Sequence, residues 1–158
     1  MDEDMAAEFI EFIEKANDES ETDPITLIIN SNGGFIFALY SMLSAIRYSK
    51  APIIGHVYGE CYSFAVPILL ACNKKVASPF ANFMLHDVSC AYSKQTRLLT
   101  EWQELMQNMT DTRKFYTEFV VSHSNITHEF LETIYSKKID YHFNTDEAIE
   151  LGIIDRVI

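Results

Sequence analysis

One short segment, Gly59–Phe64, has the sequence GECYSF and places a serine between two apolar stretches. The stretch before it, 52–58, is typical of a strand, and the stretch after it, 64–72, is typical of a buried helix. A serine at such a strand-to-helix turn presents its hydroxyl clear of the sheet. The N–H of the next residue, Phe64, opens the helix and has no acceptor within it. A hydroxyl beside a free N–H suits acyl transfer, so we take Ser63 as a candidate nucleophile.

A serine nucleophile requires a base that accepts its proton and a carboxylate that orients the base. Of the five histidines, His86 stands at the end of a strand-like run, and we interpret the other four as structural. Asp140 is our first choice for the carboxylate, with Asp87 and Asp155 as alternatives. Asp87 directly follows His86, and neighbouring strand residues point to opposite faces, so its side chain should not reach the His86 ring.

Two further sequence features, the Gly33–Gly34 turn and Cys61, bear on this proposed acyl transfer. The turn that ends in Gly33 and Gly34 follows the first predicted strand, and a backbone without Cβ atoms admits a substrate peptide closely. A free N–H in this turn would share an oxyanion with the N–H of Phe64. Cys61 lies two residues before Ser63, and we interpret it as a small packed thiol rather than a nucleophile.

The composition narrows the class of protein. Twelve Lys and Arg against 23 Asp and Glu give a formal charge of −11, which repels nucleic acid and anionic lipid. The apolar runs are far shorter than the roughly 18 residues of a membrane span, and the acidic start does not resemble a secretory signal. The three cysteines have no metal-ligand spacing and cannot all pair. We therefore expect a cytoplasmic protein with reduced thiols, without a metal or a cofactor, and without nucleic-acid or membrane partners.

Strand-like and helix-like segments alternate along the chain, which indicates an α/β protein with a largely parallel sheet around one core. The pattern predicts helices from Met5, over 35–48, over 64–72 and from Thr127 and Thr145, and strands over 25–29, 52–58, 75–77, 82–85 and 153–158. Residues 17–23 are predicted as an acidic loop. The apolar spacing from Lys94 to His123 predicts a helix roughly 45 Å long, which would extend beyond so small a core and pack against another subunit.

Four motifs occur in a fixed order: Ile28–Gly34, Gly59–Ser63, Met84–His86 and Asp146–Asp155. Together they resemble the Clp protease proteolytic subunit family, ClpP, over nearly the whole chain. The resemblance implies a crotonase-like α/β fold with repeated ββα units and a protruding handle helix. It implies one domain over residues 1–158, with a handle region at about 88–123.

The resemblance also implies a serine endopeptidase and assigns roles to eight residues. Ser63 is implied as the nucleophile, His86 as the general base and Asp140 as the orienting carboxylate. Gly34 and Phe64 are implied to donate the N–H groups of the oxyanion hole. Gly33, Val88 and Ser89 are implied to contact the substrate.

The partners implied by the resemblance are further copies of the chain, an ATP-driven unfoldase and unfolded polypeptides. The copies would form heptameric rings stacked in pairs, a tetradecamer that encloses a degradation chamber. The unfoldase would be an AAA+ chaperone of the ClpX or ClpA type, which makes the degradation ATP-dependent. No cofactor is implied for peptide cleavage itself.

The sequence departs from the family pattern at several positions. Asn32 replaces a proline, Tyr62 and Phe64 are bulkier than the usual neighbours of the serine, and 87–92 lacks the glycines expected there. These departures leave a second hypothesis open, a catalytically inactive ring subunit with a closed substrate groove. A third is a crotonase relative that stabilises acyl-CoA enolates with paired N–H groups, although such an enzyme needs no serine nucleophile.

Overall fold

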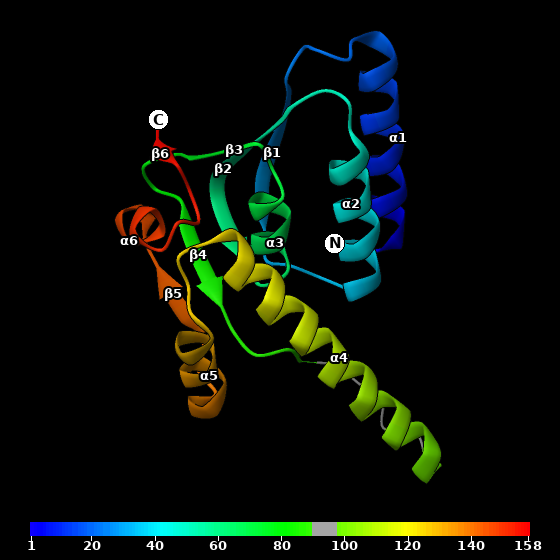
Figure 1. Cartoon of the computed structure of the whole chain (residues 1–158), viewed down its shortest axis with the longest axis vertical. Helices are drawn as coiled ribbons and strands as arrows, with labels where there is room; N and C mark the ends of the chain where they lie inside the picture. Colours follow the sequence, from blue (N-terminus) through cyan, green and yellow to red (C-terminus); the bar gives the residue numbers. More distant parts are fainter. Residues whose placement is uncertain (90–97) are drawn as a thin grey trace.

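The computed structural model describes residues 1–89 and 98–158, which form a six-stranded, mainly parallel sheet with helices packed on it (Figure 1). The helices are α1 (Glu3–Glu19), α2 (Ile36–Tyr48), α3 (Ala65–Leu70), α4 (Leu99–His123), α5 (His128–Lys137) and α6 (Thr145–Glu150). The strands are β1 (Ile25–Ser31), β2 (Ile53–Tyr62), β3 (Lys74–Ala77), β4 (Asn82–Leu85), β5 (Tyr141–Phe143) and β6 (Arg156–Val157).

Strand β2 organises the sheet, because it is long enough to pair with three other strands. Strand β1 runs parallel along one side of β2, while β3 and then β4 pair in parallel with successive parts of the other side. Strand β6 continues the sheet beyond β3, and β5 pairs with β4 in the antiparallel direction. The prediction of a largely parallel α/β sheet is therefore confirmed.

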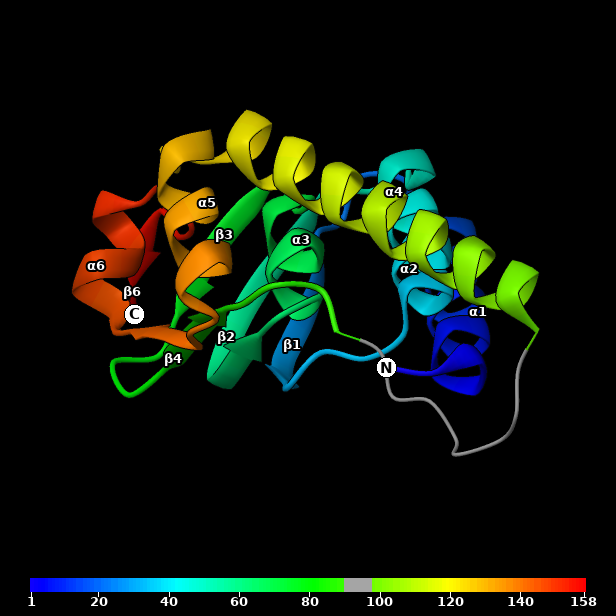
Figure 2. The ribbon, with the colours of Figure 1, turned by 90° about the horizontal axis from the view of Figure 1, so that it is seen from below.

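The core lies between the sheet and the helices that pack on it. Every residue of α3 is buried, and this short helix contacts both β2 and α4. Figure 2 shows α3 between the sheet and α4, which crosses above it. A helix without a polar face fits this place because it has apolar neighbours on more than one side.

Helix α4 is buried over its second half only. Its buried residues are Thr112, Tyr116, Thr117 and Val120, whereas Leu99 and Met106 in the first half are exposed. In Figure 1 its first turns project away from the other helices, as predicted for a handle. The predicted start at Lys94 lies outside the described residues, as does Cys90.

Several predicted boundaries were wrong. Helix α1 continues to Glu19, where a loop was predicted from Asn17, and the last strand is confined to Arg156–Val157. Strand β2 runs four residues past the predicted 52–58, because its end pairs with β4 as well as β1. Strand β5 was not predicted, since three residues are too short for a visible alternation. No helix within the described residues combines the length and apolar character that crossing a membrane requires.

The contact between β2 and α3 gives a first testable prediction. A Cβ on Gly55 would lie 2.7 Å from Leu69 Cδ1 and 3.0 Å from Cys72 Sγ, so Gly55→Ala overpacks a rigid part of the core. We expect it to lower the free energy of unfolding by about 1–3 kcal/mol in urea titrations. The matched control is Gly59→Ala on the same strand, whose Cβ would meet Asn30 Oδ1. The exposed Asn30 side chain can move away at the expense of its hydrogen bond from the Glu60 N–H, so this variant should cost less. Equal costs for the two variants would contradict this packing.

Candidate active site

Ser63 occupies a tight turn between β2 and α3. Its φ of +53° is in the left-handed region, which a residue with a Cβ adopts only when the surrounding structure holds it there. Two backbone hydrogen bonds do so: the N–H of Ser63 donates to the carbonyl oxygen of Met84 at 2.9 Å, and the N–H of Val66 donates to that of Ser63 at 3.0 Å. The predicted strand-to-helix turn is therefore present, and it turns the hydroxyl out of the sheet.

Gly33 supports this turn from the neighbouring segment. Its φ is +98°, and a Cβ at this position would lie 2.9 Å from Ser63 Cβ and 3.2 Å from the carbonyl oxygen of Tyr62. Only glycine allows the two backbones to approach so closely. The predicted role of Gly33 in substrate binding stays a prediction, since the described contact is with the Ser63 turn.

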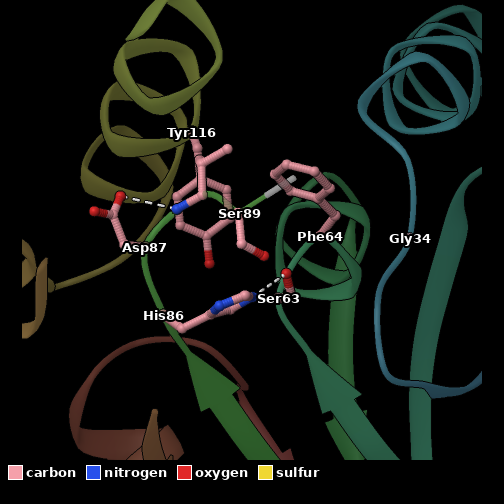
Figure 3. A pocket seen from close by; sticks show the side chains of 8 residues that line it. Gly34, Ser63, Phe64, His86, Asp87, Ser89 and Tyr116 are labelled. Carbon is pink, nitrogen blue, oxygen red and sulfur yellow. Dashed lines mark hydrogen bonds between the residues drawn. The ribbon is translucent and has the colours of Figure 1, made fainter. Parts of the chain in front are cut away.

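His86 lies within hydrogen-bonding distance of Ser63. The distance between His86 Nε2 and Ser63 Oγ is 2.7 Å, and Figure 3 shows the imidazole directed at the hydroxyl. In the tautomer with its proton on Nδ1, the imidazole accepts the hydrogen bond from the serine. The register of the sheet explains the contact. Tyr62 of β2 pairs with Met84 of β4, and Ser63 and His86 come one and two residues after this pair.

Asp140 lies on the other side of the imidazole, at a longer distance. Its Oδ1 is 4.0 Å from His86 Nδ1, and its side chain is 67% exposed. The pairing of Tyr141 with Leu85 in β5 and β4 places the two residues beside each other. The three predicted triad residues thus meet at one place, with the carboxylate further from the imidazole than a direct hydrogen bond allows.

A small cavity of about 50 Å³ lies at the Ser63 hydroxyl (Figure 3). Six of the eight predicted site residues line it: Gly34, Ser63, Phe64, His86, Val88 and Ser89. Gly33 and Asp140 are not part of its lining. Phe64 precedes the first helical residue of α3, so its N–H is one of the first amides of that helix. Asp87 and Tyr116 complete the lining; Asp87 was considered only as an alternative for the orienting carboxylate, and Tyr116 was not predicted as a site residue.

A larger cavity of about 490 Å³ adjoins the small one and shares Gly34, Phe64, Val88 and Ser89 with it. Its other walls are mainly apolar, and they include Phe35, Phe37 and Tyr40 from the start of α2 and Leu105 and Met109 from α4. The aromatic residues directly after the Gly33–Gly34 turn were a usable signal in the sequence. We interpreted them only as the start of a helix.

Tyr116 brings an unusual group to the small cavity. The residue is 2% exposed, and its hydroxyl has no hydrogen-bond partner among the described residues. Burial, with smaller contributions from the nearby Tyr135 and Cys61, raises the pKa of Tyr116 well above 10. The phenol therefore stays protonated at any physiological pH. The helical spacing of Tyr116 in the sequence indicated a core position, and no sequence motif indicated that it lines the cavity at Ser63.

Asp87 does not contact His86 within the described residues. Its carboxylate lies 3.2 Å from Nε of Arg113 and accepts a hydrogen bond from the N–H of Val88 at 2.8 Å. The strand β4 ends at Leu85, so the alternation of strand faces used above does not apply to Asp87. The partners of this carboxylate are therefore Arg113 and the N–H of Val88.

Cys61 is fully buried, and burial raises the pKa of its thiol far above the ordinary value. Burial likewise raises the pKa of Cys72 to about 12. Nucleophilic attack by cysteine requires the thiolate, which these environments suppress. Neither thiol is a competing nucleophile for Ser63.

The hydroxyl groups of two buried tyrosines should affect the free energy of unfolding differently. Tyr116→Phe removes a hydroxyl without a partner, so we expect the free energy of unfolding to stay level or rise by about 1 kcal/mol. The control is Tyr135→Phe, because the Tyr135 hydroxyl lies 3.0 Å from Thr117 Oγ1 and its loss leaves that hydroxyl unpaired. This variant should lose about 1–2 kcal/mol. Urea unfolding at equal protein concentration measures both, and a greater loss in Tyr116→Phe would contradict the description of Tyr116.

Comparisons with known proteins identify the family and the fold. The family model of Clp protease matches residues 1–158. An ATP-dependent Clp protease proteolytic subunit of Deinococcus radiodurans is 27% identical over 148 residues, which is 92% of this chain and 69% of that protein. A mutant of ClpP1 from Listeria monocytogenes has the same fold, with a TM-score of 0.86 and 19% identity over 99% of this chain and 85% of that one. The predicted ClpP-like fold is confirmed, and the chain belongs to the Clp protease family.

Proposed function

We propose that this chain is a proteolytic subunit that hydrolyses peptide bonds with Ser63, His86 and Asp140 as its catalytic triad. The observation that carries the proposal is the 2.7 Å contact between Ser63 Oγ and His86 Nε2, in a chain that matches the Clp protease family over its whole length. A serine in hydrogen bond with an imidazole is the arrangement that activates a hydroxyl as a nucleophile.

In the proposed reaction, Ser63 Oγ attacks the carbonyl carbon of the scissile peptide bond and passes its proton to His86 Nε2. The backbone N–H groups of Gly34 and Phe64, residues that both line the cavity at Ser63, donate hydrogen bonds to the resulting oxyanion. His86 then gives the proton to the departing amine, which leaves an acyl ester on Ser63. Water, deprotonated by His86, hydrolyses this ester and regenerates the serine.

Asp140 has the supporting role of orienting the imidazole and stabilising its protonated form. The separation of 4.0 Å is long for this role. Catalytic hydrogen bonds are often long without substrate and shorten when it binds. The exposed Asp140 lies in a short connection between α5 and β5, where a small shift would bring the carboxylate to Nδ1.

The exposed apolar residues along the first half of α4, Leu99 and Met106 among them, support assembly of the chain. A helix that projects with such residues gains from packing against another copy. We propose the assembly implied by the family resemblance: heptameric rings stacked in pairs, an AAA+ unfoldase of the ClpX or ClpA type, and unfolded polypeptides as substrates. The relative from Deinococcus radiodurans is by name a subunit of an ATP-dependent protease, which accords with this.

The larger cavity is the proposed site for the side chain that precedes the scissile bond. It adjoins Gly34 and Phe64, and its walls are apolar and aromatic. We expect fluorogenic peptides with Leu, Met or Phe at this position to show a kcat/KM about tenfold or more above that of the Ala peptide, because each buried methylene contributes about 0.8 kcal/mol. Peptides with Asp or Glu there should be slowest, since Asp111 also lines the cavity. A flat profile across this series would contradict the assignment.

Labelling by a fluorophosphonate tests the nucleophile directly. The wild-type protein should form a covalent adduct that peptide mapping places on Ser63, whereas Ser63→Ala should not react. His86→Ala should react more slowly by a large factor, since general-base catalysis contributes about 10²–10⁴ in rate. Adduct formation at the same rate in Ser63→Ala would remove the basis of the proposal.

One observation favours a second candidate function, an inactive ring subunit. Asp140 is exposed and beyond hydrogen-bonding distance of His86, so the triad is not closed as described. A subunit that serves only in assembly would show the ring mass by native mass spectrometry but would neither react with the probe nor cleave short peptides. Turnover of such peptides by the purified chain excludes this alternative.

A further inference from the structure

Arg113 joins three segments that surround the candidate triad. Its Nε lies 3.2 Å from Asp87 Oδ1, and its Nη2 lies 3.3 Å from Glu132 Oε2. Its guanidinium carbon is also 4.3 Å from the centre of the Tyr135 ring, which is a cation–π contact. One side chain of α4 therefore holds both the segment after β4 and the helix α5.

These two segments lead directly to two members of the triad. Asp87 is the residue after His86, so the ion pair restrains the backbone from which the imidazole projects. Helix α5, which carries Glu132 and Tyr135, ends at Lys137 and is followed within three residues by Asp140. His86 and Asp140, whose side chains are 4.0 Å apart, therefore lie on two segments that both contact Arg113.

The energetic contribution of these contacts to folding is expected to be small. The side chains of Arg113 and Asp87 are 38% and 37% exposed, and that of Glu132 is 63% exposed. Arg113 and Asp87 are thus partly exposed, although the contacting Nε atom is buried. Ion pairs near the surface typically contribute about 0.2–1 kcal/mol, whereas a misplacement of about 1 Å in a catalytic group costs about 10²-fold in rate. The loss of Arg113 should therefore affect positioning more than stability.

Building on the proposed function, we propose that Arg113 is a positioning residue for the triad, acting through Asp87 on the segment that carries His86. The planar guanidinium contacts both carboxylates at the same time: Nη2 donates a hydrogen bond to Glu132, and Nε forms an ion pair with Asp87 that is not aligned as a hydrogen bond. Lysine, with a single charged nitrogen on a flexible stem, reproduces the charge of this contact but not its geometry.

The test is a double-mutant cycle with Arg113→Met, Asp87→Asn and the two combined. The readout is the second-order rate constant for fluorophosphonate labelling of Ser63, with peptide kcat and KM measured alongside. We expect each single variant to label about 10–100-fold more slowly, with the loss in kcat rather than in KM. Because both act through one contact, the double variant should be within about threefold of Arg113→Met. Arg113→Lys should recover part of the rate.

A matched control is Glu118→Gln. Glu118 pairs with His128 at 3.2 Å and so also links α4 to α5, but both side chains are more than half exposed and the pair does not include the segment after His86. Its labelling rate should stay within about twofold of wild type, as expected for a surface pair. Thermal unfolding and native mass should be close to wild type in all variants.

Two results in the variants would overturn the inference. Wild-type labelling rates in Arg113→Met and Asp87→Asn would do so, and so would losses that multiply in the double variant, since Arg113 would then not act through Asp87. If Arg113→Met does not fold, Asp87→Asn breaks the same ion pair at a partly exposed position and decides alone. An unreactive wild-type protein would remove the proposed function and this inference together, whereas a reactive wild type with equally reactive variants removes only the inference.

Discussion

The pairing of β2 with β4 is the constraint on which the site depends. These parallel strands are in register from Glu60 with Asn82 to Tyr62 with Met84, so both chains leave the sheet at the same edge. The hydrogen bond from the Ser63 N–H to the Met84 carbonyl extends this pairing into the turn itself. Parallel strands present their carboxyl ends together, which is why side chains distant in the sequence meet there. A slip of one residue in this register would turn the side chains of β4 to the other face of the sheet and displace His86, which directly follows the strand.

The third member of the site depends on a different and weaker element. Asp140 is positioned by β5, which has three residues and pairs with β4 at Leu85 and Tyr141. A short edge strand and an exposed connection restrain a side chain less than two buried parallel strands do. The contrast between 2.7 Å for the serine and histidine and 4.0 Å for the histidine and aspartate follows from this difference. It is also why a contact such as that of Arg113, which ties α5 to the segment after His86, matters more here than elsewhere.

Much of this was predictable from the sequence, and the reasons are physical. The turn at Ser63 was predicted because a strand-like and a helix-like pattern meet there, and the parallel sheet because strands alternate with helices. The order of four motifs indicated the family. The sequence did not reveal β5, which is too short to show a pattern, or the role of Asp87, whose partner Arg113 is 26 residues away. Tyr116 was missed because the spacing that marks a core residue says nothing of which cavity its hydroxyl reaches.

Two energetic costs of the fold lie at this cavity, and they bear on function. A left-handed serine costs about 1–3 kcal/mol, and the buried Tyr116 hydroxyl without a described partner adds up to about 1 kcal/mol. They persist because the surrounding residues, such as Cys61, Phe83 and Leu85, are completely buried and cannot relax around them. A subunit needed only for assembly would gain nothing from a strained turn that points a hydroxyl at an imidazole, since serine is not required there for packing. The strain is explained if the hydroxyl must stand free of the sheet, within reach of a base and of a substrate carbonyl, and this argument favours an active peptidase over an inactive ring component.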